Sequence, residues 1–432
     1  MNIRRKVFFM LDHDHMIDEQ LKEIVQANED DDFAKKFHDK CIGNLLEQIK
    51  LYVPFYQNLS CENFADLPVV NKVMMRENMD SFRSVAPLKL GKIRHTSGST
   101  GIPFEILQDV RKAKRIQAEV IYYREITGDV LGTKYINLIS PSRIDKASKL
   151  SDFKQNVVAF DVTKMDSTTL EKLHSVLLRN RDIYYMMGFA SALERIADYF
   201  LEKGSQNQKF PLKAIVSSSE ILTPTTFEKL RSVFKCPIFD RYSNEDNGFI
   251  AQTDGISRDF LVNRGSYFVE ILKMDRDVPA EENEIGRIVI TDYFNYLQPF
   301  VRYDTGDLGA YSYRKIGEAT RFVITKLAGR ISDVVYNEND EPISTFAIGC
   351  IFEVFSKIKQ YQLIQNTKNE FVLNIINPQR DYSDDEFVKA LKTVLGNSIH
   401  VHITYVNNIP VLNSGKFKRV ICNYVPQKNN KK

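Results

Sequence analysis

The amino-acid sequence predicts an α/β protein, in which a large N-terminal domain with mostly parallel sheets flanked by helices precedes a small α+β domain. The chain has 432 residues, 43% of them hydrophobic. This length exceeds what a single hydrophobic core usually supports. Helical patterns alternate with short apolar runs between residues 163 and 243, as is typical of a parallel sheet covered by helices. After Gly329 the pattern changes to strands around one helix. We therefore expect one domain at 1–328 and a second at 329–432.

The composition of the chain excludes several classes of protein. A formal net charge of +3 is too small to indicate nucleic-acid binding. The apolar run from Val7 to Leu11 is too short for a signal peptide or a membrane span. Five cysteines are scattered without paired spacing, which argues against a zinc site or a disulfide framework. These features predict a cytoplasmic protein with no membrane span and no nucleic-acid partner, and they leave the oligomeric state open.

The segment before the first extended region is expected to be a helical scaffold. Helical patterns between Cys41 and Leu90 are interrupted at Pro54, Pro68 and Pro87, because proline does not continue a helix. No group in this segment suggests chemistry of its own.

In the alternating region, two pairs of residues have the spacing of helix capping boxes. Thr168 with Glu171 and Ser191 with Glu194 predict helix starts, and Gly204 is expected to end the second helix. Three apolar runs are expected to be strands: Ile183 to Met187, Leu212 to Val216 and Pro237 to Phe239.

Polar segments follow two of these expected strands. Residues 217–220 read Ser-Ser-Ser-Glu, and residues 240–245 read Asp-Arg-Tyr-Ser-Asn-Glu. Because ligands of parallel sheets bind beyond the carboxyl ends of the strands, both segments are candidate sites. Two interpretations of Glu220 stay open, as the wall of a nucleotide pocket or as an acid at the start of a helix.

The C-terminal region is expected to hold two strands and a helix. Residues 371–376 and 400–406 are strand-like, and Ser383 with Glu386 forms a capping box for a helix that ends near Gly396. This pattern predicts the small α+β domain.

A glycine-rich loop lies between two extended stretches, residues 92–95 and 103–107. Its glycines let backbone N–H groups and hydroxyls converge on phosphate oxygens. It is not a Walker loop, because no lysine follows its second glycine, and an ordinary surface turn uses the same residue types. A bound polyphosphate would therefore need a cation and a Mg²⁺ carboxylate from elsewhere. The loop residues are Thr96, Ser97, Gly98, Ser99, Thr100 and Gly101.

Four further motifs follow the loop in order. They are Arg241-Tyr242-Ser243-Asn244-Glu245, Tyr303-Asp304-Thr305-Gly306-Asp307, Gly329-Arg330-Ile331-Ser332-Asp333 and Asn413-Ser414-Gly415-Lys416-Phe417-Lys418-Arg419. With the loop, this order resembles the adenylate-forming superfamily of acyl-CoA ligases, luciferases and peptide-synthetase adenylation domains. Residues 53–56 and 67–72 resemble signatures of its phenylacetate-CoA ligase branch, which includes CapK-like members associated with capsular polysaccharide. The resemblance covers about residues 50 to 422.

The resemblance implies how the large domain would bind ATP and Mg²⁺. Residues 96–101 would hold the phosphates, and Glu245 would bind the Mg²⁺. Asp307 would accept hydrogen bonds from the ribose hydroxyls, and Arg330 would assist near the ribose.

Two further segments are assigned to the nucleotide pocket. Either Tyr242 or Arg241 would lie beside the adenine, because the usual tyrosine and glycine ahead of the metal-binding acid are here Arg241 and Tyr242. Ser219 and Glu220 are assigned to the same pocket.

In the resemblance, the small domain is a mobile lid that carries the catalytic lysine. Lys416 would contact the α-phosphate and the substrate carboxylate, and the domain would swing about Ser332. Relatives often have two successive acids at this hinge, whereas this chain has Ser332 and Asp333.

The implied reaction joins a carboxylic acid to AMP, with ATP and Mg²⁺, and then passes the acyl group to a thiol, most simply that of coenzyme A. Since one anion attacks another, charge neutralisation and positioning would supply most of the catalysis. Two alternatives stay open: transfer to a carrier protein or an amine in surface-polysaccharide biosynthesis, and a nucleotide-binding partner protein without ligase activity. A P-loop kinase is disfavoured by the missing lysine.

Overall fold

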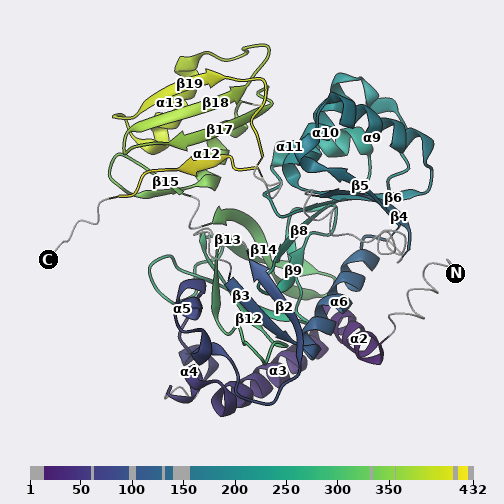
Figure 1. The fold of residues 1–432 in the computed structure, drawn as a ribbon, viewed down its shortest axis with the longest axis vertical. Helices are drawn as coiled ribbons and strands as arrows, with labels where there is room; N and C mark the ends of the chain where they lie inside the picture. Colours follow the sequence, from purple (N-terminus) through teal and green to yellow (C-terminus); the bar gives the residue numbers. More distant parts are fainter. Residues whose placement is uncertain are drawn as a thin grey trace.

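The computed structural model describes residues 14–59, 63–96, 104–128, 132–139, 156–330, 334–355, 357–411 and 417–426, with the backbone alone at residues 96, 344, 346 and 353. Figure 1 shows a large body of sheet and helices, with a small C-terminal body beside it. The predicted fold class is confirmed: a mixed α/β body with helices on a large sheet, and a small domain with sheets of its own.

Helices α2, His15–Glu29, and α3, Asp31–Tyr52, follow each other with a single residue between them. Asp30 performs both caps: its N–H donates to the carbonyl of Gln26 at 2.8 Å, and its carboxylate accepts from the N–H of Phe33 at 2.9 Å. As expected, Pro54 marks a break. The elements that follow are α4, Pro54–Gln57, the 3₁₀ helix Phe64–Asp66, β1, Val70–Asn71, α5, Lys72–Glu77, and the 3₁₀ helix Met79–Phe82.

The glycine-rich loop closes a β-hairpin. Strands β2, Leu90–Thr96, and β3, Phe104–Asp109, are antiparallel, and Thr96 pairs with Phe104. The two stretches that the sequence predicts to be extended are therefore the two sides of this hairpin. Asp109 then caps helix α6, Val110–Glu125, by accepting from the N–H of Lys112 at 2.8 Å.

Five strands form the parallel half of the main sheet, in the order β5-β4-β6-β7-β8. All three strands expected here are present, and helices α9, α10 and α11 lie together beside them (Figure 1). Their shared core includes Leu173, Ile196 and Leu230, all fully buried. The bounds are β4, Lys134–Ile139, β5, Val157–Asp161, α9, Ser167–Arg179, β6, Ile183–Gly188, α10, Ala190–Glu202, β7, Ala214–Ser218, α11, Pro224–Phe234, and β8, Ile238–Asn244, with 3₁₀ helices at Val162–Lys164 and Ser205–Asn207.

Both capping boxes predicted in this half are wrong. Helix α9 is capped by the carboxylate of Asp166, which accepts from the N–H of Thr169 at 2.8 Å. Helix α10 begins after Phe189, which provides no side-chain cap. In the first helix Asp166, two residues before Thr168, provides the cap in its place. In the second helix, a carboxylate distant in sequence accepts from an N–H of the first turn. Gly204 has a left-handed φ of 63° just after α10, as predicted. No helix in the described ranges combines the length and apolar character needed to cross a membrane.

The other half of the main sheet is antiparallel, which the predicted "mostly parallel" description did not include. Its strands continue from β8 in the order β9-β10-β14-β13-β12-β11. Hairpins need only short turns, and β13 and β14 reverse at Gly317, which has a φ of 63°. The bounds are β9, Gly248–Gln252, β10, Phe260–Val262, β11, Tyr267–Leu272, β12, Gly286–Asp292, β13, Tyr303–Ile316, and β14, Ala319–Arg330.

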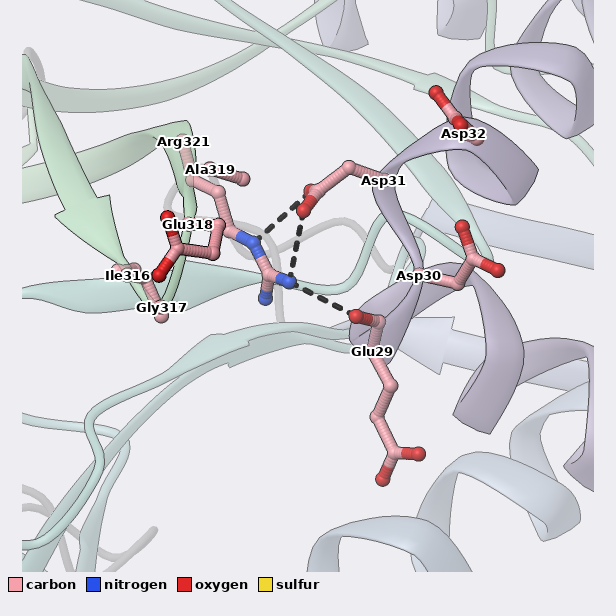
Figure 2. A pocket seen from close by; sticks show the side chains of 9 residues that line it. All are labelled: Glu29, Asp30, Asp31, Asp32, Ile316, Gly317, Glu318, Ala319 and Arg321. Carbon is pink, nitrogen blue, oxygen red and sulfur yellow. Dashed lines mark hydrogen bonds and ion pairs between the residues drawn. The ribbon is translucent and has the colours of Figure 1, made fainter.

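The tip of the β13–β14 hairpin docks on the junction of α2 and α3. Figure 2 shows Arg321 reaching to Asp31 and to the carbonyl of Glu29. The Nε of Arg321 lies 3.0 Å from the Asp31 carboxylate, and its Nη2 donates to Glu29 at 3.0 Å. The acidic segment in this figure thus binds a structural arginine, Arg321.

The small domain is built around a four-stranded sheet in the order β19-β18-β17-β20. The predicted capping box is present, since Ser383 and Glu386 each bond the other's backbone, and Gly396 ends that helix with a φ of 101°. The predicted boundary at 328 and 329 falls within β14 and stays a prediction. The bounds are β15, Val334–Tyr336, β16, Pro342–Ser344, α12, Thr345–Glu353, β17, Gln360–Gln365, β18, Glu370–Ile376, α13, Asp384–Leu395, β19, His400–Tyr405, and β20, Val420–Cys422.

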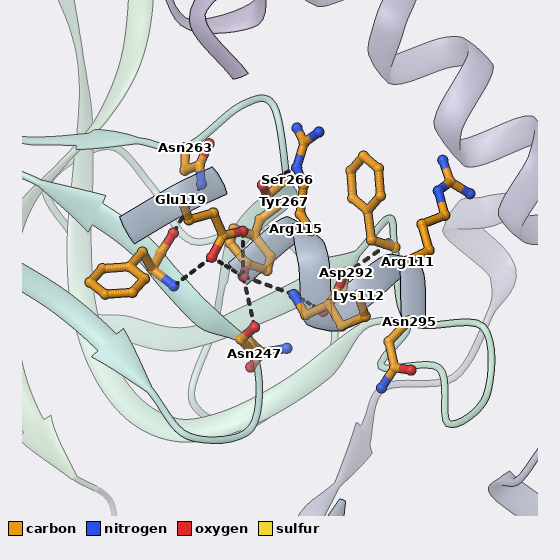
Figure 3. Close-up of polar contacts among 12 residues, drawn as sticks. Arg111, Lys112, Arg115, Glu119, Asn247, Asn263, Ser266, Tyr267, Asp292 and Asn295 are labelled. Carbon is orange, nitrogen blue, oxygen red and sulfur yellow. Dashed lines mark hydrogen bonds and ion pairs between the residues drawn. The ribbon is translucent and has the colours of Figure 1, made fainter. Parts of the chain in front are cut away.

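A buried ionic network ties α6 to the antiparallel half (Figure 3). The ammonium of Lys112 lies 2.6 Å from Asp292, and both side chains are fully buried. Lys112 also donates to the hydroxyl of Tyr267 at 3.0 Å, and that hydroxyl contacts Glu119 at 3.0 Å and the carbonyl of Asn247 at 2.8 Å. Burial raises the pKa of Glu119, and the charge of Lys112 offsets part of this effect. Helix α6 is therefore fixed to the turn that follows β8.

Asp240, in β8, predicts a pH dependence of stability. Burial raises the pKa of this carboxyl to about 7, so between pH 4 and 7 the folded protein holds a proton that the unfolded chain has lost. Stability therefore falls as the pH rises through this window. For Asp240→Asn, the free energy of unfolding relative to wild type should rise by about 1.4 kcal/mol per pH unit across it. Urea unfolding at several pH values measures this difference, with the exposed Asp275→Asn as the control. A difference independent of pH would refute the assignment.

Candidate active site

The side chains of Tyr242, Asp307 and Arg330 meet, as their assignment to one nucleotide pocket requires. The Tyr242 hydroxyl donates to Asp307 Oδ2 at 2.8 Å, and Arg330 Nε donates to Asp307 Oδ1 at 3.1 Å. Burial raises the pKa of Asp307, and the charge of Arg330 opposes the rise. Burial and the Asp307 charge raise the pKa of Tyr242 well above 10, which keeps its hydroxyl a donor. The cluster offers an oriented carboxylate on β13, opposite the last residue of β14.

The rest of the Tyr303–Asp307 motif shapes the turn that presents this carboxylate. Asp304 accepts from the N–H of Gly306 at 2.9 Å and from Arg287 at 3.0 Å. The Thr305 hydroxyl donates to a carbonyl of β12 at 2.9 Å and accepts from the N–H of Asp307 at 3.1 Å. Gly306 has a φ of 74°, a conformation that favours glycine. Three of the five residues therefore hold the backbone so that Asp307 faces Tyr242.

Of two successive acids after β8, one faces outward and one is committed to the core. Asp246 is 9% exposed; it pairs with Lys72 at 3.2 Å and accepts from the Tyr303 hydroxyl at 2.7 Å. Glu245 is 46% exposed, and the guanidinium of Arg94 lies 3.6 Å from its Oε2. Glu245 is thus the acid with room for a further ligand.

Arg241 lies apart from the Asp307 cluster. Successive side chains of a strand point to opposite faces, and Arg241 donates to Gln252 at 2.7 Å with its guanidinium 4.9 Å from the Phe249 ring centre. Burial lowers its pKa to about 10. Of the two residues assigned beside the adenine, Tyr242 contacts Asp307, whereas Arg241 contacts Gln252.

Glu220 joins the start of α10 to the C-terminal segment. Its Oε2 accepts from the N–H of Ser191 at 2.8 Å, and its Oε1 accepts from the N–H of Phe417 at 2.6 Å. The first contact is that of an acid at a helix start, one of the two interpretations left open above. Ser219, just before it, has a left-handed φ of 72°, which turns the chain so that Glu220 reaches both donors.

Gly329, the first residue of the predicted hinge motif, lies close to Ile221, which follows Glu220. Its φ is 90°, and a Cβ there would clash with the Thr345 hydroxyl and lie 3.8 Å from Ile221. Glycine thus permits the start of α12 to approach β14. Since Ile221 follows Glu220 and Arg330 follows Gly329, the Asp307 cluster and the Phe417 segment belong to one region.

Helix α10 is the surface on which the small domain rests. Arg419 lies 3.2 Å from Glu194 on this helix, and Lys359 pairs with Glu202 at its end. Burial lowers the pKa of Arg419, but the charges of Glu194 and Glu220 raise it by more. Both of these contacts, like that of Glu220, join residues more than 150 positions apart.

Several predicted residues lie outside the described part of the chain. They are Ser97, Gly98, Ser99, Thr100, Gly101, Ser332 and Lys416, and Thr96 is described only by its backbone. Phe417, which directly follows Lys416, is described and buried.

Sequence reasoning missed Arg94, Lys72 and Asp246. Arg94 precedes the loop by two residues, so a search for the missing cation on both sides of the loop would have found it. Lys72 lies in the signature at residues 67–72, but its pairing with Asp246 arises only in the fold and had no local signal.

Replacement of Glu220 by glutamine tests its double contact. A glutamine retains one acceptor and turns an N–H₂ group toward a backbone N–H, which leaves a donor unpaired at a cost of about 1–3 kcal/mol. One of the two bound amides, that of Phe417 or that of Ser191, should then exchange about ten-fold faster or more. Hydrogen exchange with mass spectrometry measures this, and Glu202→Gln, which removes an exposed pair, should change little. Equal exchange in Glu220→Gln and wild type would contradict the contact.

Comparisons with known proteins identify the fold of the chain. Residues 335–423 match the model of the CapK C-terminal domain family. No curated protein sequence matches the chain. Among solved structures, 2-hydroxyisobutyryl-CoA ligase in the postadenylation state, in complex with R3-HIB-AMP, is 17% identical with a TM-score of 0.68, and 88% of each chain is covered. ATP-bound MatB from Rhodopseudomonas palustris is 13% identical with a TM-score of 0.53, over 77% of this chain and 66% of that one.

The similarity extends to another state of the same ligase. The same 2-hydroxyisobutyryl-CoA ligase in the thioesterification state, with 2-HIB-AMP and CoA, is again 17% identical over 89% of each chain, yet its TM-score is 0.55. This chain has the fold of these CoA ligases, and its residues 335–423 match the CapK C-terminal domain model.

Proposed function

We propose that this protein activates a carboxylic acid with ATP and transfers the acyl group to a thiol, most simply that of coenzyme A. In the first step a carboxylate oxygen bonds to the α-phosphorus and pyrophosphate leaves. In the second the thiol sulfur bonds to the acyl carbon, AMP leaves, and the thiol proton passes to solvent. The observation that carries the proposal is the meeting of Tyr242, Asp307 and Arg330 in the region where Phe417, next to Lys416, is held.

The Asp307 cluster suits a nucleoside. Each carboxylate oxygen accepts one hydrogen bond, from Tyr242 or from Arg330, and retains a lone pair for a ribose hydroxyl. Arg330 is 52% exposed and can follow the ligand. We assign Tyr242 to the adenine, and Ser219 and Glu220 to the edge of the pocket.

Glu245 is the proposed Mg²⁺ ligand. Mg²⁺ is usually held by one or two carboxylates together with substrate phosphates and water, so a single outward-facing glutamate fits the ion. The described residues contain no cluster of three or more potential ligands, which suits a site completed by the substrate. When bound, Mg²⁺ would neutralise part of the phosphate charge.

Lys416 is proposed to stand between the two reacting anions. The Phe417 amide is bound to Glu220 and the Arg419 guanidinium to Glu194, so the residues that follow Lys416 are held beside the large domain. A preorganised ammonium there stabilises the charge that develops as pyrophosphate leaves. The loop at residues 96–101 would hold the phosphates, and Ser332 would be the hinge for the second step.

The acceptor separates the main proposal from its alternative. The CapK C-terminal domain match favours an alternative in which a carrier-protein thiol or an amine of surface-polysaccharide biosynthesis takes the acyl group. A nucleotide-binding partner protein without ligase activity is the remaining alternative.

Acid-dependent exchange of labelled pyrophosphate into ATP tests the first step. With Mg²⁺ and a panel of aromatic, fatty and amino acids, we expect exchange with at least one acid. The panel is run with and without free coenzyme A, because coenzyme A drains the adenylate and yields a thioester only if it is the acceptor. No exchange with any acid would favour the binding-protein alternative.

Lys416→Ala should slow adenylation by about 10² to 10³, the scale for removing one preorganised charge-stabilising donor. Lys418→Ala, an exposed lysine two residues away, is the matched control and should retain wild-type exchange. Single-turnover formation of acyl-AMP measures both. A rate for Lys416→Ala within two-fold of wild type would remove Lys416 from the mechanism.

A further inference from the structure

The glycine-rich loop lacks the lysine that loops of this kind usually place on phosphates, and the strand before it carries another cation, Arg94. Arg94 lies on β2, two residues before the strand ends and the loop begins. Its guanidinium points to Glu245, with Nη1 3.6 Å from Oε2. The strand that leads into the loop therefore holds a cation beside the proposed Mg²⁺ carboxylate.

The hydrogen-bonding capacity of Arg94 is not used up. Its Nε is buried and has no hydrogen-bond partner among the described residues. The contact with Glu245 is longer than a normal hydrogen bond. A guanidinium has five N–H donors in a planar fork that matches phosphate oxygens, so Arg94 has donors left for a ligand.

Further cations extend from Arg94 along a cleft between β2 and α6. The cleft has a volume of about 340 Å³, and Lys89, Lys92 and Lys114 line it together with Arg94. Lys114 is paired with Asp14 at 3.1 Å. Burial and the charge of Arg94 lower the pKa of Lys92, while Glu245 opposes this effect. The like charges repel each other, so an anion bound among them would be stabilised.

We propose that Arg94, with Lys92 behind it, binds the β- and γ-phosphates of ATP and the departing pyrophosphate. This inference rests on the proposed function, and it adds the group that replaces the loop lysine. Before substrate binds, Arg94 and Glu245 balance each other's charge. On binding, Glu245 turns to Mg²⁺ and Arg94 to the phosphate oxygens, so the pair opens without leaving either charge unpaired.

An ordinary structural ion pair is the competing explanation, and it makes a different prediction. A partly exposed pair contributes about 0–1 kcal/mol to stability, and its loss would not single out one substrate. A phosphate ligand would instead alter the affinity for pyrophosphate and ATP while leaving the KM for the carboxylic acid unchanged.

Titration calorimetry with inorganic pyrophosphate and Mg²⁺ tests the inference directly. Arg94→Ala should raise the Kd for pyrophosphate about 10- to 100-fold, since hydrogen bonds to charged groups contribute about 1.5–3 kcal/mol. Arg94→Lys should recover part of the loss, because an ammonium supplies the charge without the fork. Arg83→Ala is the matched control: this arginine pairs with Glu105 on β3 at 2.7 Å, and the Kd should not change. In the exchange assay, the KM for pyrophosphate should rise in Arg94→Ala alone.

The outcomes separate this inference from the proposed function. A Kd for pyrophosphate unchanged in Arg94→Ala overturns the role of Arg94, even if wild type catalyses exchange. Weakened binding in Arg94→Ala, with no exchange in wild type for any acid, supports the phosphate site and counts against the ligase activity. Failure of wild type to bind pyrophosphate overturns both.

Discussion

The buried contact between Lys112 and Asp292 is the interaction on which the rest of the site depends. Two fully buried opposite charges 2.6 Å apart join α6 to β12, and loss of one partner from such a pair typically costs about 3–5 kcal/mol. Helix α6 starts directly after the hairpin that carries the loop. Through Tyr267 the same network grips the carbonyl of Asn247, two residues beyond Glu245. The hairpin and the acid are thereby positioned by one buried cluster.

Gly248 shows how tight this arrangement is. Its φ is 128°, and a Cβ there would lie 2.7 Å from both Glu119 and the Tyr267 hydroxyl. Any other residue would push the network away from the turn after β8. Both the positive φ and the close approach of the network require a glycine here.

Much of the fold could be predicted from the sequence, because its signals are local. The strand β6 and the capping box at Ser383 depend on residues close together in the chain. The starts of α9 and α10 could not be predicted as reliably, since the cap of α10 is Glu220, 29 residues away. The antiparallel half of the sheet was also missed, because its hairpins follow the alternating region and carry no helical pattern between strands.

The candidate site likewise contains residues that the sequence predicted and contacts that it did not. Ordered motifs identified Tyr242, Asp307 and Arg330, which the fold brings into contact. The commitment of Asp246 to Lys72 and Tyr303 depends on three distant segments and had no signal in the sequence. The sequence also could not separate the two faces of β8, because Arg241 and Tyr242 are neighbours in the chain and differ only in the direction the pleat gives them.

The contacts between the small domain and the large one have a consequence for domain exchange between proteins. Glu194, Glu202 and Glu220 of the large domain accept polar contacts from the small one. Three carboxylates thus receive an arginine, a lysine and a backbone amide, and only two of these donors depend on side-chain identity. A foreign C-terminal domain that kept basic residues at the positions of Lys359 and Arg419 would make the same contacts. The small domain is in this sense a replaceable module, because its attachment to the large domain requires few specific side chains of its own.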